Sequence, residues 1–147
     1  MFSHILIPTD GTERSHRAAE AGIALAKSLG ARVTAFFAAP PATPLVYRDL
    51  LPVEYMTPEE HTALIRRTAA RYLGAVEKAA KKAGVPCTPF TVTSDFPAEA
   101  ILAAAKKCKC DLIFISSHGR KGLAKAILGS QTQKVLSEAK IPVLVHR

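Results

Sequence analysis

Small, hydroxyl-bearing and cationic residues cluster after an apolar run in the last third of the chain, and a helical pattern begins shortly afterwards. This cluster and the helix start contain Ser116, Ser117, His118, Gly119, Arg120, Gly129, Ser130, Gln131 and Thr132. A strand that leads into such a loop and then into a helix is suited to binding phosphate, because backbone N–H groups and the helix dipole both favour an anion there. The pattern therefore predicts a protein that handles nucleotides.

Individual residues of this cluster have alternative roles. Ser130 either donates its hydroxyl and N–H to phosphate or caps the following helix, with Gln133 completing a capping box. His118 and Arg120 either contact phosphate or face water. The two glycines either let the backbone approach a ligand closely or punctuate the loop.

Strand-like and helix-like segments alternate along the chain and must position this cluster. Apolar runs predict strands over 4–9, 32–38, 87–93, 111–115 and 141–145, and helical spacing predicts helices over 12–29, 57–83, 97–108 and 130–139. Thr57 and Glu60 form a capping box at the second helix, and Pro89 places the third strand at a sheet edge. Apolar strands separated by amphipathic helices predict an α/β fold, a doubly wound parallel sheet with helices on both faces, in one domain over 1–147.

In a doubly wound sheet of strand order 3-2-1-4-5, the first and fourth strands are neighbours and the winding reverses beside them. Pro8, Thr9 and Asp10 end the first strand, so they emerge beside the cluster that follows the fourth. Asp10 either accepts a hydrogen bond from a ribose hydroxyl or helps to hold a divalent ion near phosphates, and it can also cap the first helix. Two separate sequence features thus meet where the fold predicts a pocket.

Composition limits the partners and the compartment. The formal net charge of +8 suits an anionic partner, but the cations are spread over several segments without interleaved aromatics, so we expect mainly solvated helix faces. The alternative, nucleic-acid binding through the net charge, predicts a steep salt dependence. No apolar run reaches the roughly 20 residues that span a bilayer, and residues 1–7 read as a strand rather than a signal peptide, which predicts a cytoplasmic protein. Cys108 and Cys110 lack the further ligands that zinc requires.

Several familiar enzyme motifs are missing from the sequence. No GxxxxGK[ST] loop is present, and no GxGxxG follows the first strand. No nucleophile elbow, no obvious base for activating water and no arginine-finger signature is recognisable. We therefore expect a binding protein rather than an enzyme, with nucleotide hydrolysis slow at most.

Over its whole length the sequence resembles the universal stress protein family. The resemblance lies in the opening Ile-Leu-Ile-Pro-Thr-Asp-Gly-Thr-Glu, in Ser-Ser-His-Gly-Arg-Lys-Gly-Leu, in Leu-Gly-Ser-Gln-Thr-Gln-Lys-Val-Leu and in the closing Ile-Pro-Val-Leu-Val. It implies a Rossmann-like fold of the adenine nucleotide alpha hydrolase-like type. Nucleotide-binding members carry the motif G-x2-G-x9-G-[ST]; Gly119, Gly129 and Ser130 match its later part, whereas Ser116 stands at its first glycine.

The resemblance also implies a ligand, which is ATP with Mg or Mn held through the phosphates. Asp10 would lie near the ribose and phosphates, Val33 or its strand neighbours would border adenine, and Gly119, Gly129, Ser130 and Gln131 would cradle the phosphates. The complete candidate site comprises Pro8, Thr9, Asp10, Val33, Ser116, Ser117, His118, Gly119, Arg120, Gly129, Ser130, Gln131 and Thr132.

The resemblance further implies a homodimer formed through the last strand, residues 141–145. This strand is flat and hydrophobic, so pairing with a second copy would protect an edge that otherwise promotes aggregation. The implied function is a stress-response regulator that acts on a protein partner. The alternative is a nucleotide-free dimeric interaction module of the same fold, in which Ser116 weakens ATP binding.

Overall fold

The computed structural model describes residues 1–41, 56–118 and 128–147. Strands and helices alternate along these residues, as the sequence predicts. The strands are β1 (His4–Pro8), β2 (Arg32–Ala39), β3 (Cys87–Thr93), β4 (Leu112–Ser116) and β5 (Val143–His146). The helices are α1 (Glu13–Leu29), α2 (Pro58–Ala83), α3 (Pro97–Lys107) and α4 (Ser130–Glu138).

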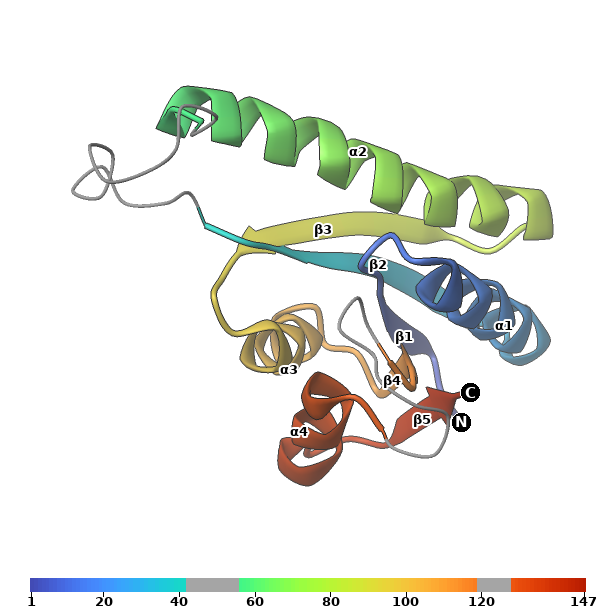
Figure 1. Cartoon of the computed structure of the whole chain (residues 1–147). Helices are drawn as coiled ribbons and strands as arrows, with labels where there is room; N and C mark the ends of the chain where they lie inside the picture. The colour runs from blue at the N-terminus through green and yellow to red at the C-terminus, as the bar shows by residue number, and fades with distance from the viewer. Residues whose placement is uncertain (42–55, 119–127) are drawn as a thin grey trace.

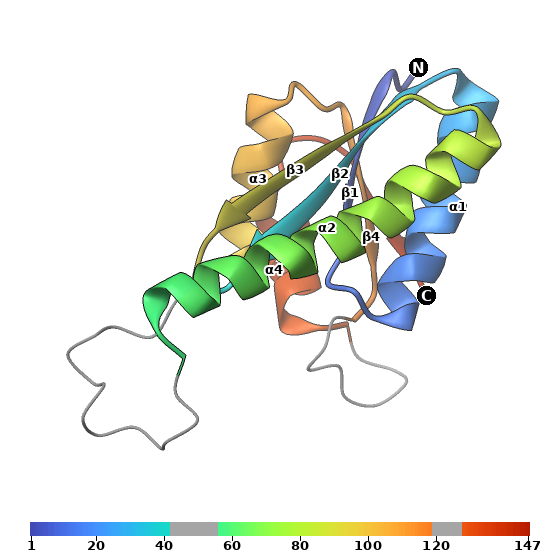
Figure 2. The same cartoon turned by 90° about the horizontal axis from the view of Figure 1, so that it is seen from above.

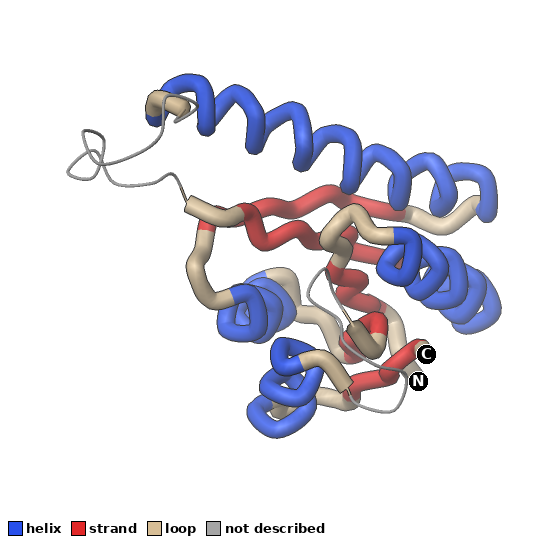
Figure 3. The backbone as a smooth tube through the Cα atoms, viewed as in Figure 1, coloured by secondary structure: helices blue, strands red, loops and turns tan. Residues whose placement is uncertain are grey.

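The strands form one parallel sheet in the order β3-β2-β1-β4-β5. Helices α1 and α2 cover one face, and α3 and α4 cover the other (Figure 1, Figure 3). The predicted doubly wound sheet with the order 3-2-1-4-5 is therefore confirmed. Because Pro89 lies on β3, it occupies an edge strand as expected, opposite Ala35 of β2.

Alternation along the central strands builds a hydrophobic core on each face of the sheet. Ile5 and Ile7 of β1 are fully buried beneath α1 and α2, whereas Leu6 points to the opposite face and packs with Phe36 beneath α3 and α4. Helix α1 lies very close to the sheet at Gly22, where an added Cβ would approach Ile7 Cδ1 to 2.8 Å. The two cores hold the strands in position, and so they also position the carboxyl ends of the strands, where the candidate site lies.

The helix termini follow the sequence signals in one case and depart from them in another. Thr57 and Glu60 form the predicted capping box at α2. The predicted box of Ser130 and Gln133 is wrong, because Gly129 is the N-cap of α4. The Gln133 side chain instead donates from Nε2 to the carbonyl of Leu128 at 2.7 Å, so α4 begins without a side-chain cap.

The boundaries of β4 and β5 differ slightly from the prediction. Strand β5 begins at Val143 rather than at Ile141, because Pro142 has no N–H to donate to the ladder. The carbonyl of Pro142 still accepts from the Ile113 N–H at 3.0 Å. Asp111 precedes β4 rather than starting it, because its carboxylate binds the chain ahead of β1. It accepts from the N–H and hydroxyl of Ser3 and from the N–H of His4, at 2.8 to 3.0 Å.

These hydrogen bonds make Asp111 a source of pH-dependent stability. Burial raises its pKa, but the bonds from His4 and Ser3 outweigh burial and hold the pKa below its ordinary value. The resulting stability is present above the unfolded pKa of about 3.9 and is lost as the pH falls through the folded value. We expect Asp111→Asn to cost about 1 kcal/mol at pH 7 and much less at pH 3 by urea unfolding. An equal cost at both pH values would contradict this assignment.

Candidate functional site

The carboxyl ends of β1 and β4 lie next to each other in the sheet, since Leu6 of β1 is in register with Ile113 of β4. The chain leaves β1 into α1, and the start of α4 returns to the end of β4, where the Gly129 N–H donates to the carbonyl of Ser117 at 2.8 Å. Figure 2 shows α1 and α4 on opposite sides of the sheet near these strand ends. Two predicted groups of residues, 8–10 and 116–118 with 129–132, are therefore brought together.

The turn from β1 to α1 is held by a network of short polar side chains. Asp10 Oδ1 accepts from the Thr12 N–H at 3.0 Å and from the Thr12 hydroxyl at 2.6 Å. Thr12 in turn caps α1 by accepting from the Ser15 N–H at 3.2 Å. Asp10 thus fixes the capping residue rather than capping the helix itself, and its carboxylate is held at the positive end of α1.

Thr9 and Gly11 complete this turn. The buried Thr9 hydroxyl lies 3.1 Å from the Ser15 hydroxyl, and the Thr9 N–H donates to the Phe36 carbonyl at 2.8 Å. Gly11 has φ +79°, and an added Cβ there would collide with the Tyr72 ring. Both the backbone conformation and the close approach of α2 therefore require glycine at this position.

The end of β4 is buried and polar. The Ser116 hydroxyl donates to the carbonyl of His118 at 2.9 Å, and the Ser117 hydroxyl lies 3.0 Å from His118 Nδ1. His118 is only 7% exposed, so the alternative in which it faces water is wrong. Its Nε2 is buried and has no hydrogen-bond partner among the described residues. A buried polar atom without a partner is costly unless a ligand or water satisfies it.

The start of α4 offers backbone donors rather than side chains. No side chain of the described residues caps α4, whereas Thr12 and Thr57 cap α1 and α2. The first N–H groups of a helix have no acceptor within that helix. The N-terminus of α4, which begins at Ser130, therefore presents uncapped donors together with the positive end of its dipole, and this arrangement suits an anion.

The side chains of Gln131 and Thr132 hold α4 in place. The Thr132 hydroxyl is 3% exposed and donates to the Ser116 carbonyl at 3.0 Å. Gln131 Oε1 accepts from the Ala98 N–H at 3.0 Å, which supplies a cap for α3. Both side chains are therefore engaged in structural contacts, and these residues can contribute to an anion site through their backbone N–H groups.

The structure does not bring every predicted residue to this place. Val33 lies near the amino end of β2, in register with Ile5 and Cys87, and is 1% exposed within the core. The predicted position of Val33 beside the ligand is therefore corrected. The carboxyl end of β2, which faces the site, is at Ala39, six residues further along the strand. Gly119 and Arg120 lie outside the described residues.

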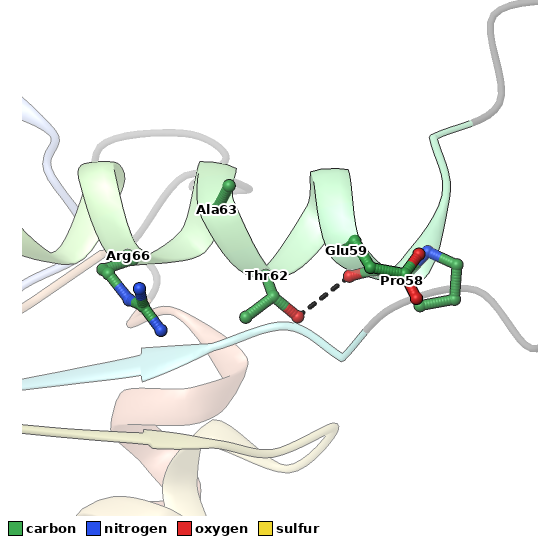
Figure 4. A pocket seen from close by; sticks show the side chains of 5 residues that line it. All are labelled: Pro58, Glu59, Thr62, Ala63 and Arg66. Carbon is green, nitrogen blue, oxygen red and sulfur yellow. Dashed lines mark hydrogen bonds between the residues drawn. The ribbon is translucent and has the colours of Figure 1, made fainter.

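A pair of cysteines and a hollow on α2 lie apart from the predicted site residues. Cys108 and Cys110 are free thiols next to the amino end of β4, away from the strand ends that carry Asp10 and Ser117, and burial raises the pKa of Cys110 to about 12. A hollow of about 360 Å³ lies along the first turns of α2, and Figure 4 shows the side chains that line it. It is lined by Pro58, Glu59, Thr62, Ala63 and Arg66, none of which is a predicted site residue. Among the described residues no group of three His, Cys, Asp or Glu side chains could hold a metal ion.

None of the described helices combines the length and the apolar character needed to cross a bilayer. The described site is a polar edge of the sheet, at the carboxyl ends of β1 and β4. Its described part contains the Asp10 carboxylate at the start of α1, the N-terminus of α4 without a side-chain cap, and the buried Nε2 of His118.

Comparison with known proteins gives a consistent result. The model of the universal stress protein family matches residues 1–147. A universal stress protein of Thermus aquaticus is 33% identical over 147 residues, which is the full length of both chains. A universal stress protein solved in complex with cAMP has a TM-score of 0.73 at 22% identity, over 99% of this chain and 97% of that one.

A second solved structure, the universal stress protein of Archaeoglobus fulgidus in complex with dAMP, has a TM-score of 0.69 at 16% identity, over 100% of this chain and 98% of that one. At these identities the two structures establish a shared fold. The family match over the whole chain and the full-length relative establish more: the chain belongs to the universal stress protein family.

Proposed function

We propose that this protein binds ATP at the carboxyl ends of β1 and β4 and acts as a stress-response regulator rather than as an enzyme. The observation that carries the proposal is the uncapped N-terminus of α4 beside the end of β4, where His118 Nε2 is buried without a partner among the described residues. Phosphate oxygens would accept from the N–H groups of α4, and a polar ligand atom would satisfy the imidazole.

Other residues of the site fit the remaining parts of a nucleotide. Asp10 is held at the start of α1 by Thr12, where a carboxylate is suited to accept from ribose hydroxyls. The universal stress proteins solved with cAMP and with dAMP, both adenine nucleotides, support this class of ligand. Because ATP carries more phosphate than either, the N-terminus of α4 would have a larger anionic group to bind.

A divalent ion would accompany ATP through the phosphate oxygens. Oxygen ligands suit Mg²⁺, which is commonly bound through substrate phosphates and one or two carboxylates while keeping several waters. Asp10 is the carboxylate of the described site, so Mg²⁺ or Mn²⁺ fits as part of a metal–nucleotide complex. The ion would neutralise phosphate charge, while Asp10 and Thr12 would keep their structural hydrogen bonds.

We further propose a cytoplasmic homodimer that pairs through β5 and acts on a protein partner. Strand β5 pairs with β4 on one side and ends the described sheet on the other. Leu144, in the middle of the strand, is 39% exposed. A second copy would cover this apolar edge, which would otherwise be open to nonspecific pairing.

Mass spectrometry of small molecules released by denaturing the purified protein tests the ligand. We expect ATP, or an adenine nucleotide derived from it, at a ratio to protein that survives extensive dialysis. Protein purified in parallel with Asp10→Ala should release much less. Release of equal amounts from both samples would show that the nucleotide is carried elsewhere, and the proposal would then be wrong.

The alternative is a nucleotide-free dimeric module, and Ser116 is the residue that favours it. Ser116 occupies the first glycine of the family motif, and its side chain is 8% exposed at the end of β4. Its hydroxyl is turned to the carbonyl of His118. This bond keeps the hydroxyl within the loop that follows β4, so the proposal for ATP requires that Ser116 be tolerated.

Replacing Ser116 by glycine distinguishes the ATP-binding protein from the nucleotide-free module. If ATP binds as proposed, we expect Ser116→Gly to change the dissociation constant less than about threefold, because the hydroxyl is already satisfied within the protein. Ser116→Ala is the matched control, since it removes the hydroxyl and retains Cβ. A gain of tenfold or more in Ser116→Gly, absent in Ser116→Ala, would show that Cβ obstructs the ligand and would favour the nucleotide-free module.

A further inference from the structure

The outward side of α2 carries a row of cations. The stripe, as we call it, comprises Arg67, Arg71, Lys78, Lys81 and Lys82, all exposed. At about 100° per residue, these five fall within about 100° of the helix circumference and extend over about 22 Å. The buried residues of α2, among them Leu73 and Val76, lie on the opposite side. In Figure 1, α2 crosses the top of the molecule with its outer side away from the sheet.

Among the described residues no acid pairs with the stripe, whose Arg71 lies over the Tyr72 ring at 5.2 Å from the centroid. Glu77 lies outside the 100° arc and is half-buried. On the adjacent helix α1, Glu13 pairs with Arg17 at 3.3 Å and Glu20 lies 3.5 Å from His16. Within the described part of the chain the stripe is therefore a basic face of α2 that carries no salt bridge.

Small residues separate the cations. Ala70, Gly74 and Ala75 lie between Arg71 and its neighbours along the outer side. An added Cβ at Gly74 would meet nothing within 4 Å, so neither packing nor a left-handed backbone requires glycine there. Glycine in a helix interior is unfavourable. Because Gly74 has no side chain, a rigid anionic partner can approach the helix closely between Arg71 and Lys78.

We propose that the stripe binds the phosphate backbone of duplex nucleic acid without reading its sequence. The surface has cations but no exposed aromatic on which single-stranded bases could stack. It has no large apolar anchor of the kind found at protein interfaces, and none that would enter a bilayer. A duplex backbone needs only an extended array of cations, which the helix supplies. The sequence expectation that these cations are merely solvated did not include their alignment on one face.

This proposal is independent of the nucleotide site, because the stripe shares no residue with it. The test is fluorescence anisotropy of the full-length protein with a labelled 30-base-pair duplex of random sequence, at 50 to 200 mM salt. With five phosphate contacts, log K should fall against log salt with a slope of about −4.5. The triple variant Arg67→Gln, Lys78→Gln and Lys82→Gln should reduce the slope to about −1.8.

The matched control removes three exposed cations outside the stripe, Lys27→Gln, Lys106→Gln and Lys140→Gln, and lowers the net charge by the same three units. We expect this control to bind like the wild-type protein. Equal weakening in both variants would show that diffuse charge is responsible, and absence of binding at 50 mM salt would also overturn the proposal. So would stronger binding to phosphatidylserine vesicles or to polyglutamate than to the duplex, since the occupant would then be a membrane or an acidic protein.

Discussion

Replacing Asp10 by alanine is expected to lower the affinity for ATP by about 10- to 100-fold. Hydrogen bonds that involve a charged group contribute about 1.5 to 3 kcal/mol, and each 1.4 kcal/mol is a factor of ten in the dissociation constant. The substitution removes the carboxylate and also the acceptor for both Thr12 donors. Isothermal titration calorimetry with ATP and magnesium measures the loss.

The Asp10→Asn variant separates the two roles of this carboxylate. Asparagine retains an oxygen that can accept from Thr12, so the start of α1 should keep its geometry, while the charge is lost. We expect Asp10→Asn to unfold in urea like the wild-type protein and still to bind ATP more weakly. Wild-type affinity in Asp10→Ala would contradict the placement of the nucleotide beside β1.

The substitution with the largest expected effect on stability is Phe36→Ala, at about 3–5 kcal/mol. Phe36 is completely buried in the core beneath α3 and α4, and its ring stacks with that of Phe90 at a centroid distance of 5.7 Å. Truncation would leave a cavity between β2 and α3 that the rigid sheet cannot close. Urea unfolding monitored by circular dichroism gives the free energy of unfolding.

Phe90→Ala provides the comparison for this prediction. Phe90 lies on the edge strand β3 and is only half-buried, so its truncation exposes a surface that is already partly wet. We expect it to cost less than half as much as Phe36→Ala. Equal costs for the two variants, or a cost below about 1 kcal/mol for Phe36→Ala, would show that the core relaxes around the missing ring.

The strand order and the location of the site were predictable because they follow from periodicity and topology. Apolar runs that alternate with amphipathic helices fixed a parallel sheet, and the neighbouring carboxyl ends of β1 and β4 followed from its order. The start of α2 was predictable as well, because Thr57 and Glu60 form their capping box within four residues of sequence. Local signals of this kind depend on no distant part of the chain.

The errors arose where a distant element decides the local structure. Gln133 is the exception, because its predicted capping role fails for a local reason: its side chain donates to the carbonyl of Leu128, five residues earlier. Gln131 stays a predicted phosphate-binding residue through its backbone N–H, but its side chain caps α3, more than thirty residues away in the sequence. The position of Val33 along β2 depends on the register with β1, which a single strand does not reveal. The burial of His118 depends in the same way on the packing around the end of β4.

The sequence did not show whether the cations on α2 are paired with acids. Composition gave a net charge of +8, and spacing gave a helix, but whether the charges are paired depends on acids from other elements. The structure shows Glu13 and Glu20 engaged within α1. The stripe therefore becomes visible only when both helices are placed side by side.

Calorimetric titration of ATP and magnesium into protein freed of small molecules tests the central claim most directly. The account predicts saturable binding of one nucleotide per chain, weakened by Asp10→Ala and little changed by Ser116→Gly. Absence of heat and of any thermal stabilisation by ATP, in protein that is folded by circular dichroism, would contradict it. The uncapped start of α4 would then serve something other than a nucleotide.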